Sequence, residues 1–467
     1  MGYEEFVSTK LKHEPPTGMG IVPELSPHLF PHQKDLCSWA LRRGRAAVFA
    51  STGLGKSLIE LEYSRHVADH TGKPVLILAP LAVTYQTLRE GKRFGVNVTM
   101  CHEAEDIQPG INITNYERLH KFDGIEFGGV VCDESSCLKS FTSKTRTQLI
   151  ERFAATPFRL AATATPSPND VMELGNHSEF LGILSRSEML ATFFINDAGD
   201  TGKWVLKKHG RKHFWRWIAT WGAWVRHPRD LGYETEGYDL PPLDIQYHIV
   251  DAGTPSKPID TLFAMTSRTL SDQRQAKRDS LHSRVSKVVE LVRAEPSEAW
   301  VVWAELNAEQ DAIAHALGND CVSISGSDSP ESKVEKHEAW LRGEYRVIVS
   351  KVSIFGFGLN WFHCARMVFA GATHSFEGYF QAVKRCHRYG QKRTTEVHVV
   401  CGEMETEILS SLKRKEAAFF ELGESLGSEA IDAVRNEIKG TTRQRDEYMP
   451  QKTISLPNWL TTEERSA

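Results

Sequence analysis

The sequence lacks several features that would place it in a special class of protein. No stretch approaches 18 uninterrupted apolar residues, and the start, MGYEEFVSTK, has no apolar core of the kind found in signal peptides. The eight cysteines include no Cys-x-x-Cys pair, which argues against a zinc knuckle or a disulfide framework. We therefore expect a protein of the reducing cytoplasm, with no membrane partner.

Low-complexity tracts and a strong net charge are missing too. Hydrophobic residues make up 40% of the chain and charged residues 25%, which is enough apolar material to build real cores. The formal net charge is only -4, so any surface for a polyanion must come from local clustering of cations. Because domains usually hold about 100–200 residues, the length of 467 residues predicts two or three domains.

Short apolar, β-branched runs alternate with longer amphipathic stretches in two parts of the chain. The runs lie at 46–50, 74–80, 111–115, 129–134 and 159–164, and again at 299–305, 321–325, 346–350, 366–371 and 395–400. Buried parallel strands have this composition. We predict an α/β fold with two tandem parallel sheets, whose ligands bind beyond the carboxyl ends of the strands.

Between the two parts lies a basic, tryptophan-rich segment, 186–245, in which we find no buried-strand run. Residues 200–230 hold eight Lys or Arg against two Asp, together with five Trp. The spacing of Trp217, Trp221 and Trp224 favours one buried helix face, although base stacking stays open. Four cations are candidates for phosphate contact, with a merely solvated face as the alternative: Lys207, Lys208, Arg211 and Lys212.

These patterns divide the chain into five parts. We expect an N-terminal arm at 1–28, a first lobe at 29–185, a helical insert and linker at 186–245, a second lobe at 246–415, and a helical C-terminal extension with a tail at 416–467.

The string ASTGLGKS at 50–57 follows a predicted strand and precedes a helical pattern. A glycine-rich turn in that place points backbone N–H groups and a helix N-terminus at phosphate oxygens. Lys56 would reach the β- and γ-phosphates, and Ser57 would ligate Mg²⁺. The common pattern begins with Gly, and this one begins with Ala50. The residues predicted to contact the nucleotide are Thr52, Gly53, Gly55, Lys56 and Ser57.

A second string, GVVCDE at 129–134, is an apolar strand that ends in two adjacent carboxylates. Asp133 at the strand end would hold the coordination shell of Mg²⁺, and Glu134 would orient or deprotonate the attacking water. We therefore predict that Lys56, Asp133 and Glu134 are catalytic.

With these two strings in place, other blocks of the chain resemble superfamily two helicases of the DEAD/DEAH-box kind, in particular the Swi/Snf-type DNA translocases. FPHQ at 30–33 resembles the motif that reads adenine, with Gln33 on the base. LILAP at 76–80 and ITNYE at 113–117 resemble motifs that track a nucleic-acid strand, which implies a contact by Thr114.

Two further blocks of the first lobe carry the resemblance. TATP at 163–166, followed by Asn169, resembles the motif that couples hydrolysis to the grip on DNA, and this implicates Thr163. DESSCLKS at 133–140 resembles the family's Asp-Glu-x-His block, except that Ser136 stands where many members have His.

The second lobe supplies the remaining motifs. GFGLN at 356–360 resembles motif five, which implies that Gly356 contacts the nucleotide, and QAVKRCHRYGQ at 381–391 resembles motif six. By that resemblance Arg385 and Arg388 are arginine fingers with a catalytic role, and Gln381 and His387 line the cleft.

The resemblance implies two RecA-like lobes, ATP and Mg²⁺ as cofactors, and DNA, duplex rather than single-stranded, as the partner of an ATP-dependent translocase. The blocks at 169–182 and 214–233 are similar to compact helicases of bacteriophages and prophages. They imply a place in the host-cell cytoplasm and phage or host replication and recombination proteins as further partners. An RNA helicase and a non-stepping, ATP-binding recruitment module remain as alternatives.

Overall fold

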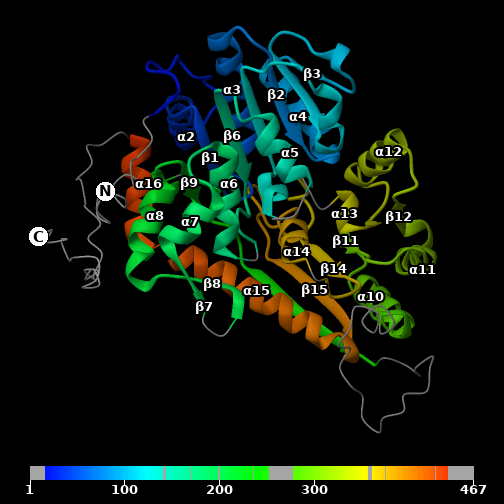
Figure 1. Ribbon diagram of the computed structural model, residues 1–467. Coiled ribbons are helices and arrows are strands. Elements are labelled where there is room, and N and C mark those ends of the chain that lie inside the picture. Colours follow the sequence, from blue (N-terminus) through cyan, green and yellow to red (C-terminus); the bar gives the residue numbers. More distant parts are fainter. Residues whose placement is uncertain are drawn as a thin grey trace, which may run out of the picture.

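The computed structural model describes residues 16–139, 144–168, 170–197, 200–234, 236–251, 277–355, 360–373, 375–425 and 427–439. Two parallel sheets, one from each half of the chain, lie next to one another with helices on both faces (Figure 1). The predicted α/β fold with two tandem parallel-sheet lobes is confirmed. Within the described ranges no helix is both long and apolar enough to cross a membrane.

Lobe 1 is built on a seven-stranded sheet of order β3-β4-β2-β5-β6-β1-β9. Its strands are β1 (Arg45–Ala50), β2 (Val75–Ala79), β3 (Val98–Met100), β4 (Ile111–Asn115), β5 (Gly129–Asp133), β6 (Phe158–Thr163) and β9 (Gly222–Val225). Because successive side chains of a strand point to opposite faces, β1 sends Ala46 and Val48 into one core and Ala47 and Phe49 into the other.

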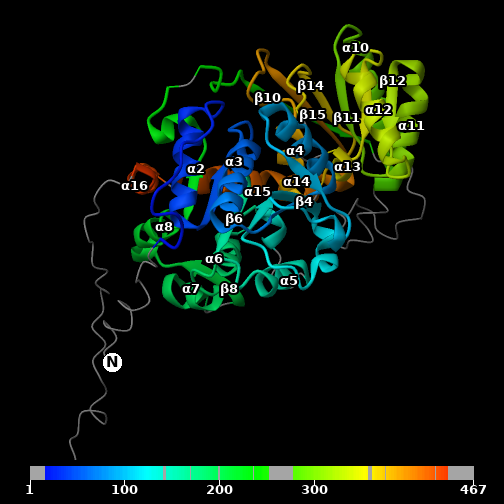
Figure 2. The same cartoon turned by 90° about the horizontal axis from the view of Figure 1, so that it is seen from above.

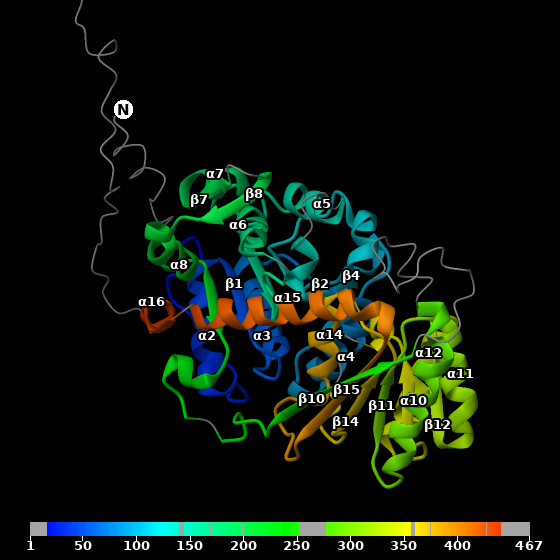
Figure 3. The ribbon, with the colours of Figure 1, turned by 90° about the horizontal axis from the view of Figure 1, so that it is seen from below.

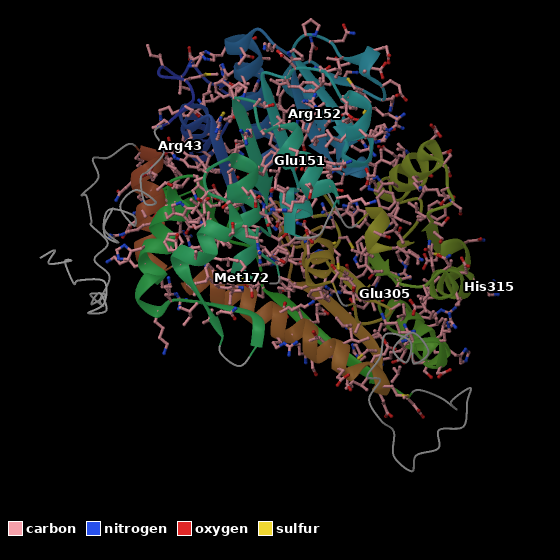
Figure 4. The ribbon with its side chains drawn as sticks, in the orientation of Figure 1. Arg43, Glu151, Arg152, Met172, Glu305 and His315 are labelled. Atoms are coloured by element: carbon pink, nitrogen blue, oxygen red, sulfur yellow. The ribbon has the colours of Figure 1, made fainter. Side chains whose placement is uncertain are left out.

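Helices cover both faces of this sheet. The first core contains residues of α2 (Pro31–Arg43), α3 (Lys56–Thr71) and α4 (Leu81–Phe94). The second contains residues of α5 (Lys144–Arg152), α6 (Leu174–Leu181), α7 (Arg186–Phe193) and α8 (Arg211–Ala219). In Figure 4, Glu151 and Arg152 mark the end of α5 in lobe 1, and His315 marks the outer side of lobe 2.

Lobe 2 is built on a six-stranded sheet of order β10-β15-β14-β11-β13-β12. Its strands are β10 (Leu243–Val250), β11 (Trp300–Trp303), β12 (Cys321–Ile324), β13 (Val347–Ser350), β14 (Arg366–Phe369) and β15 (Thr395–Gly402). Its helices are α10 (Leu281–Ala294), α11 (Asn307–Leu317), α12 (Pro330–Leu341), α13 (Val352–Phe355), α14 (Phe376–Val383) and α15 (Thr406–Ser425). The edge strand β10 was not among the predicted runs, because most of its residues are only half-buried.

The tryptophan-rich segment differs from the helical insert that we expected. Between α7 and α8 it forms an antiparallel hairpin of β7 (Phe194–Asp197) and β8 (Asp200–Leu206), and after α8 it contributes β9 to the sheet of lobe 1. Trp217 lies on α8 but Trp224 lies on β9, so the predicted single helix face is wrong. Core packing itself is confirmed, since Trp217, Trp221 and Trp224 are all buried against lobe 1.

The C-terminal extension also has a place in lobe 1. Helix α15 runs from lobe 2 across to lobe 1, where α16 (Gly427–Lys439) follows (Figure 3). Val434 and Ile438 of α16 enter the first core of lobe 1, and Arg42 Nη2 of α2 donates to the carbonyl of Ile438 at 2.9 Å. The chain therefore connects the lobes twice, once before β10 and once through α15.

Candidate active site

A cavity of about 400 Å³ lies between the two lobes. From lobe 1 it is lined by residues that the sequence singles out: Gln33, Thr52, Gly53, Gly55, Lys56, Ser57, Asp133 and Glu134. From lobe 2 it is lined by Gln381, Arg385 and Arg388. Close by, α4 of lobe 1 approaches α12 of lobe 2 (Figure 2), and Arg89 Nη1 lies 3.3 Å from Glu338 Oε1.

The loop at 50–57 joins β1 to α3 in the way the motif predicts. Gly53 and Gly55 have φ values of 90° and 76°, a region that glycine adopts without steric cost. Gly55 caps α3, whose first residue is Lys56, so the helix N-terminus opens into the cavity. Lys56 Nζ donates to the carbonyl of Ala50 at 2.9 Å, which holds the ammonium group beside the loop.

Gln33 supports this loop as well as lining the cavity. Its Nε2 donates to the carbonyl of Leu54 at 3.0 Å, and its Oε1 accepts from the N–H of Phe30 at 2.9 Å. A Cβ at Gly55 would lie 2.1 Å from Gln33 Nε2, so a larger residue there would displace the Gln33 amide, and the φ of 76° disfavours it as well. Each amide end keeps one hydrogen-bonding position for a ligand.

The two carboxylates at the end of β5 face the loop. Glu134 has a φ of 50°, the one positive value among the non-glycine residues of the described ranges, and such a conformation costs on the order of 1–3 kcal/mol. Its N–H donates to Asp133 Oδ1 at 2.7 Å. Burial, followed by the charge of Glu134, raises the pKa of Asp133 to about 7, and burial also raises the pKa of Glu134.

Lobe 2 contributes through α14 and the turn that follows it. Gln381 on α14 donates through Nε2 to Glu134 Oε2 at 3.3 Å, and Arg385 Nη2 donates to Gln381 Oε1 at 3.4 Å. Burial, and next the charge of Arg388, lowers the pKa of Arg385. A chain of hydrogen bonds thus runs from Arg385 of lobe 2 to Glu134, the carboxylate of lobe 1 that the sequence predicts to be catalytic.

Glu134 is linked to the TATP string at 163–166 without a histidine at position 136. Thr163 Oγ1 donates directly to Glu134 Oε2 at 3.4 Å. Behind the carboxylates, Ser135 Oγ pairs with His177 Nε2 at 3.1 Å, and the ring of His177 packs on Phe49. Ser136 Oγ donates to the carbonyl of Glu134. The histidine beside the string 133–140 is therefore His177 of α6, although the string itself contains no histidine.

Some sequence-predicted residues lie elsewhere. Thr114 and Thr163 are both fully buried, Thr114 as a residue of β4 and Thr163 as the last residue of β6, and their contacts with nucleic acid stay predictions. His387 does not line the cavity, because its Nε2 pairs with the carbonyl of Pro241 at 2.9 Å. Gly356 and Asn169 lie outside the described residues.

The basic segment, defined as Lys207, Lys208, Arg211 and Lys212, divides into two kinds of side chain. Lys207 Nζ donates to the carbonyls of Ala191 and Thr192 at 3.2 and 2.8 Å, so it caps α7, and its contact with phosphate stays a prediction. Lys208, Arg211 and Lys212 are exposed, Lys208 in the turn before α8 and the other two in the first turn of α8.

Several residues in or beside the cavity were not predicted from the sequence, among them Glu60, Tyr238 and Tyr389. Glu60, one turn along α3 from Lys56, is fully buried, and burial, followed by the charge of Asp133, raises its pKa. Tyr238 and Tyr389 line the cavity from the inter-lobe segment and from lobe 2. The helical spacing of Glu60 from Lys56 could have indicated it; no sequence signal indicates the two tyrosines.

The donor set fits a magnesium nucleotide. The described residues contain no group of three or more His, Cys, Asp or Glu that would form a protein-only metal cage. Mg²⁺ in nucleotide sites keeps several waters and takes one or two protein oxygens plus phosphate oxygens. Ser57 and Asp133 supply that kind of oxygen in the cavity that Lys56 lines.

The chain is similar to known proteins in structure. No family model matches the chain, and no curated protein matches it. Among solved structures it is similar to the Sulfolobus solfataricus SWI2/SNF2 ATPase core in complex with dsDNA, with a TM-score of 0.42 and 18% sequence identity. The match covers 90% of this chain and 99% of that chain.

Proposed function

We propose that this protein is an ATP-dependent DNA translocase that couples ATP hydrolysis between its lobes to movement along duplex DNA. The observation that carries the proposal is the single cavity into which a phosphate-binding loop, two strand-end carboxylates and two arginines of the other lobe converge. Neither lobe alone holds the complete set.

Each residue has a role that follows from its chemistry. Lys56 and the N–H groups at the start of α3 would bind the phosphates, and Ser57 and Asp133 would hold Mg²⁺, which when bound neutralises phosphate charge. Glu134 would orient or deprotonate the attacking water. Arg385 and Arg388 would stabilise the charge that develops on the transferred phosphoryl group.

The rate of ATP hydrolysis would therefore depend on how far the lobes close. Gln381 already bonds Glu134 across the cleft, so small relative movements of the lobes change where the arginines lie. Cycles of such closure would move lobe 2 along a strand while lobe 1 holds it. The exposed cations Lys208, Arg211 and Lys212 offer a phosphate-binding surface on lobe 1.

Triplex displacement tests this proposal. A translocase that moves on duplex DNA removes a third strand from the duplex in the presence of ATP, and Lys56→Ala should abolish that removal. ATP hydrolysis without displacement of the third strand would instead support the non-stepping module, and displacement only from RNA-containing substrates would support an RNA helicase.

A further inference from the structure

One tyrosine of the inter-lobe segment touches both halves of the active site. The ring centroid of Tyr238 lies 4.7 Å from that of Tyr389 in lobe 2. On its other side it lies 5.4 Å from the ring of His32 and 6.5 Å from the ring of Phe30, both close to edge-on. Tyr238 is only 9% exposed, so one buried ring connects the start of α2 with lobe 2.

Tyr389 belongs to the arginine turn, which we define as residues 385–389. The inter-lobe segment holds this turn at two places. A Cβ at Gly237, whose φ is 87°, would lie 2.9 Å from Tyr389 Cε2, and the carbonyl of Pro241 bonds His387 Nε2. The turn also lies against the phosphate-binding loop, since a Cβ at Gly53 would lie 3.3 Å from the backbone nitrogen of Tyr389.

The same aromatic rings line the candidate nucleotide cavity. Phe30, Tyr238 and Tyr389 line it together with Gln33. Planar rings pack favourably against one another in offset or edge-on arrangements. A nucleobase that packs beside Phe30 and Gln33 in this cavity would lie next to Tyr238, whose ring is in contact with Tyr389 of the arginine turn.

We propose that Tyr238 is a positioning residue that couples the binding of a nucleobase beside Phe30 and Gln33 to the position of the arginine turn. A purine packed at Phe30 and Gln33 fixes the ring of Tyr238, Tyr238 fixes Tyr389, and the turn then holds Arg385 and Arg388 toward the phosphates. The ligand is a nucleoside triphosphate in which the base, and not the phosphates alone, sets the hydrolysis rate. This inference rests on the proposed ATPase function.

The experiment compares ligands with and without a base. Hydrogen exchange of the peptide that covers the arginine turn is measured with ADP and with inorganic pyrophosphate, in the wild type, Tyr238→Ala and Tyr238→Phe. Tyr233→Ala is the matched control, because Tyr233 lies outside the cavity and bonds Asp35 Oδ2 at 2.6 Å. ATP turnover is measured for the same four proteins.

We expect ADP to protect the arginine turn more than pyrophosphate does in the wild type. Tyr238→Ala should make the two ligands equal and lower ATP turnover about tenfold, while Tyr238→Phe, which keeps the ring, should stay within about twofold of the wild type. The inference is overturned if Tyr238→Ala keeps the difference between the ligands, or if the wild type shows none. A wild type that hydrolyses no ATP and responds to neither ligand overturns the proposed function as well.

Discussion

The nucleotide cavity and the basic segment differ in how far the fold fixes their side chains. In the cavity Glu134, Gln381 and Arg385 are buried and joined by hydrogen bonds across the two lobes. In the basic segment Lys208, Arg211 and Lys212 are exposed, and Lys207 is held by backbone carbonyls. The side chains of the cavity are thus fixed by burial and by bonds between the lobes, whereas three cations of the basic segment lie in contact with solvent.

The largest effect should come from the arginines, because they act only when both lobes are in place. Arg385→Ala or Arg388→Ala should lower DNA-stimulated ATP turnover by a factor of about 10³–10⁵. Arg393→Ala is the matched control, since Arg393 pairs with Glu298 on the surface and should leave turnover unchanged. Steady-state phosphate release measures the turnover of each variant. A loss of turnover below tenfold in both Arg385→Ala and Arg388→Ala would show that the cavity arginines contribute little more to hydrolysis than a surface arginine does.

The carboxylate at the end of β5 should give the next largest effect. Glu134→Gln keeps the shape of the side chain but removes its basicity, so turnover should fall by about 10²–10⁴ while a non-hydrolysable ATP analogue still binds. Glu126→Gln, on an exposed glutamate paired with Lys73, serves as the control. Wild-type turnover in Glu134→Gln would contradict the assignment of the water-activating residue.

The basic segment should respond in a different way, through salt. Replacing Lys208, Arg211 and Lys212 together by Gln should weaken binding to duplex DNA and reduce the slope of log K against log salt by about 3, one for each lost phosphate contact. Arg342→Gln, on an arginine that pairs with Glu344 in lobe 2, should not change the slope. An unaltered affinity across the salt series would assign the three cations to a solvated face.

The smallest effect should come from the buried carboxyl of Glu60. Its pKa is raised in the folded protein, so the folded state binds a proton that the unfolded state has released, and the free energy of unfolding falls as pH rises from about 4 through the folded pKa. Glu60→Gln carries no charge, so between pH 5 and pH 7 it should lose less stability than the wild type does. Urea unfolding of the ligand-free protein at the two pH values measures this, and equal losses would show that Glu60 is ionised throughout.

Much of the cavity could be predicted from the sequence because its parts are local. The loop at 50–57 and the pair Asp133 and Glu134 each follow a buried strand directly, and parallel strands bring their carboxyl ends to one edge of a sheet. The arginine turn carries its own recognisable string. The placement of lobe 2 against lobe 1, through Gln381 and Glu134, agrees with what those strings imply.

The rest depends on contacts between distant segments. Strand β9 is four residues long and pairs with β1, about 175 residues earlier, so periodicity within the tryptophan-rich segment gives no sign of it. The docking of Val434 and Ile438 on lobe 1 is equally non-local. His177 reaches Ser135 from a helix about 40 residues away, and a single buried histidine has no sequence pattern.

The central claim is that one complete ATPase site forms between the lobes and serves movement on DNA. Its most direct test is ATP turnover of the purified wild type with duplex DNA, single-stranded DNA, RNA or no nucleic acid, with Lys56→Ala beside it. The account predicts strong stimulation by duplex DNA, less by single-stranded DNA and RNA, and no turnover in Lys56→Ala. Turnover that is the same with every nucleic acid and without any, or that survives in Lys56→Ala, would contradict it.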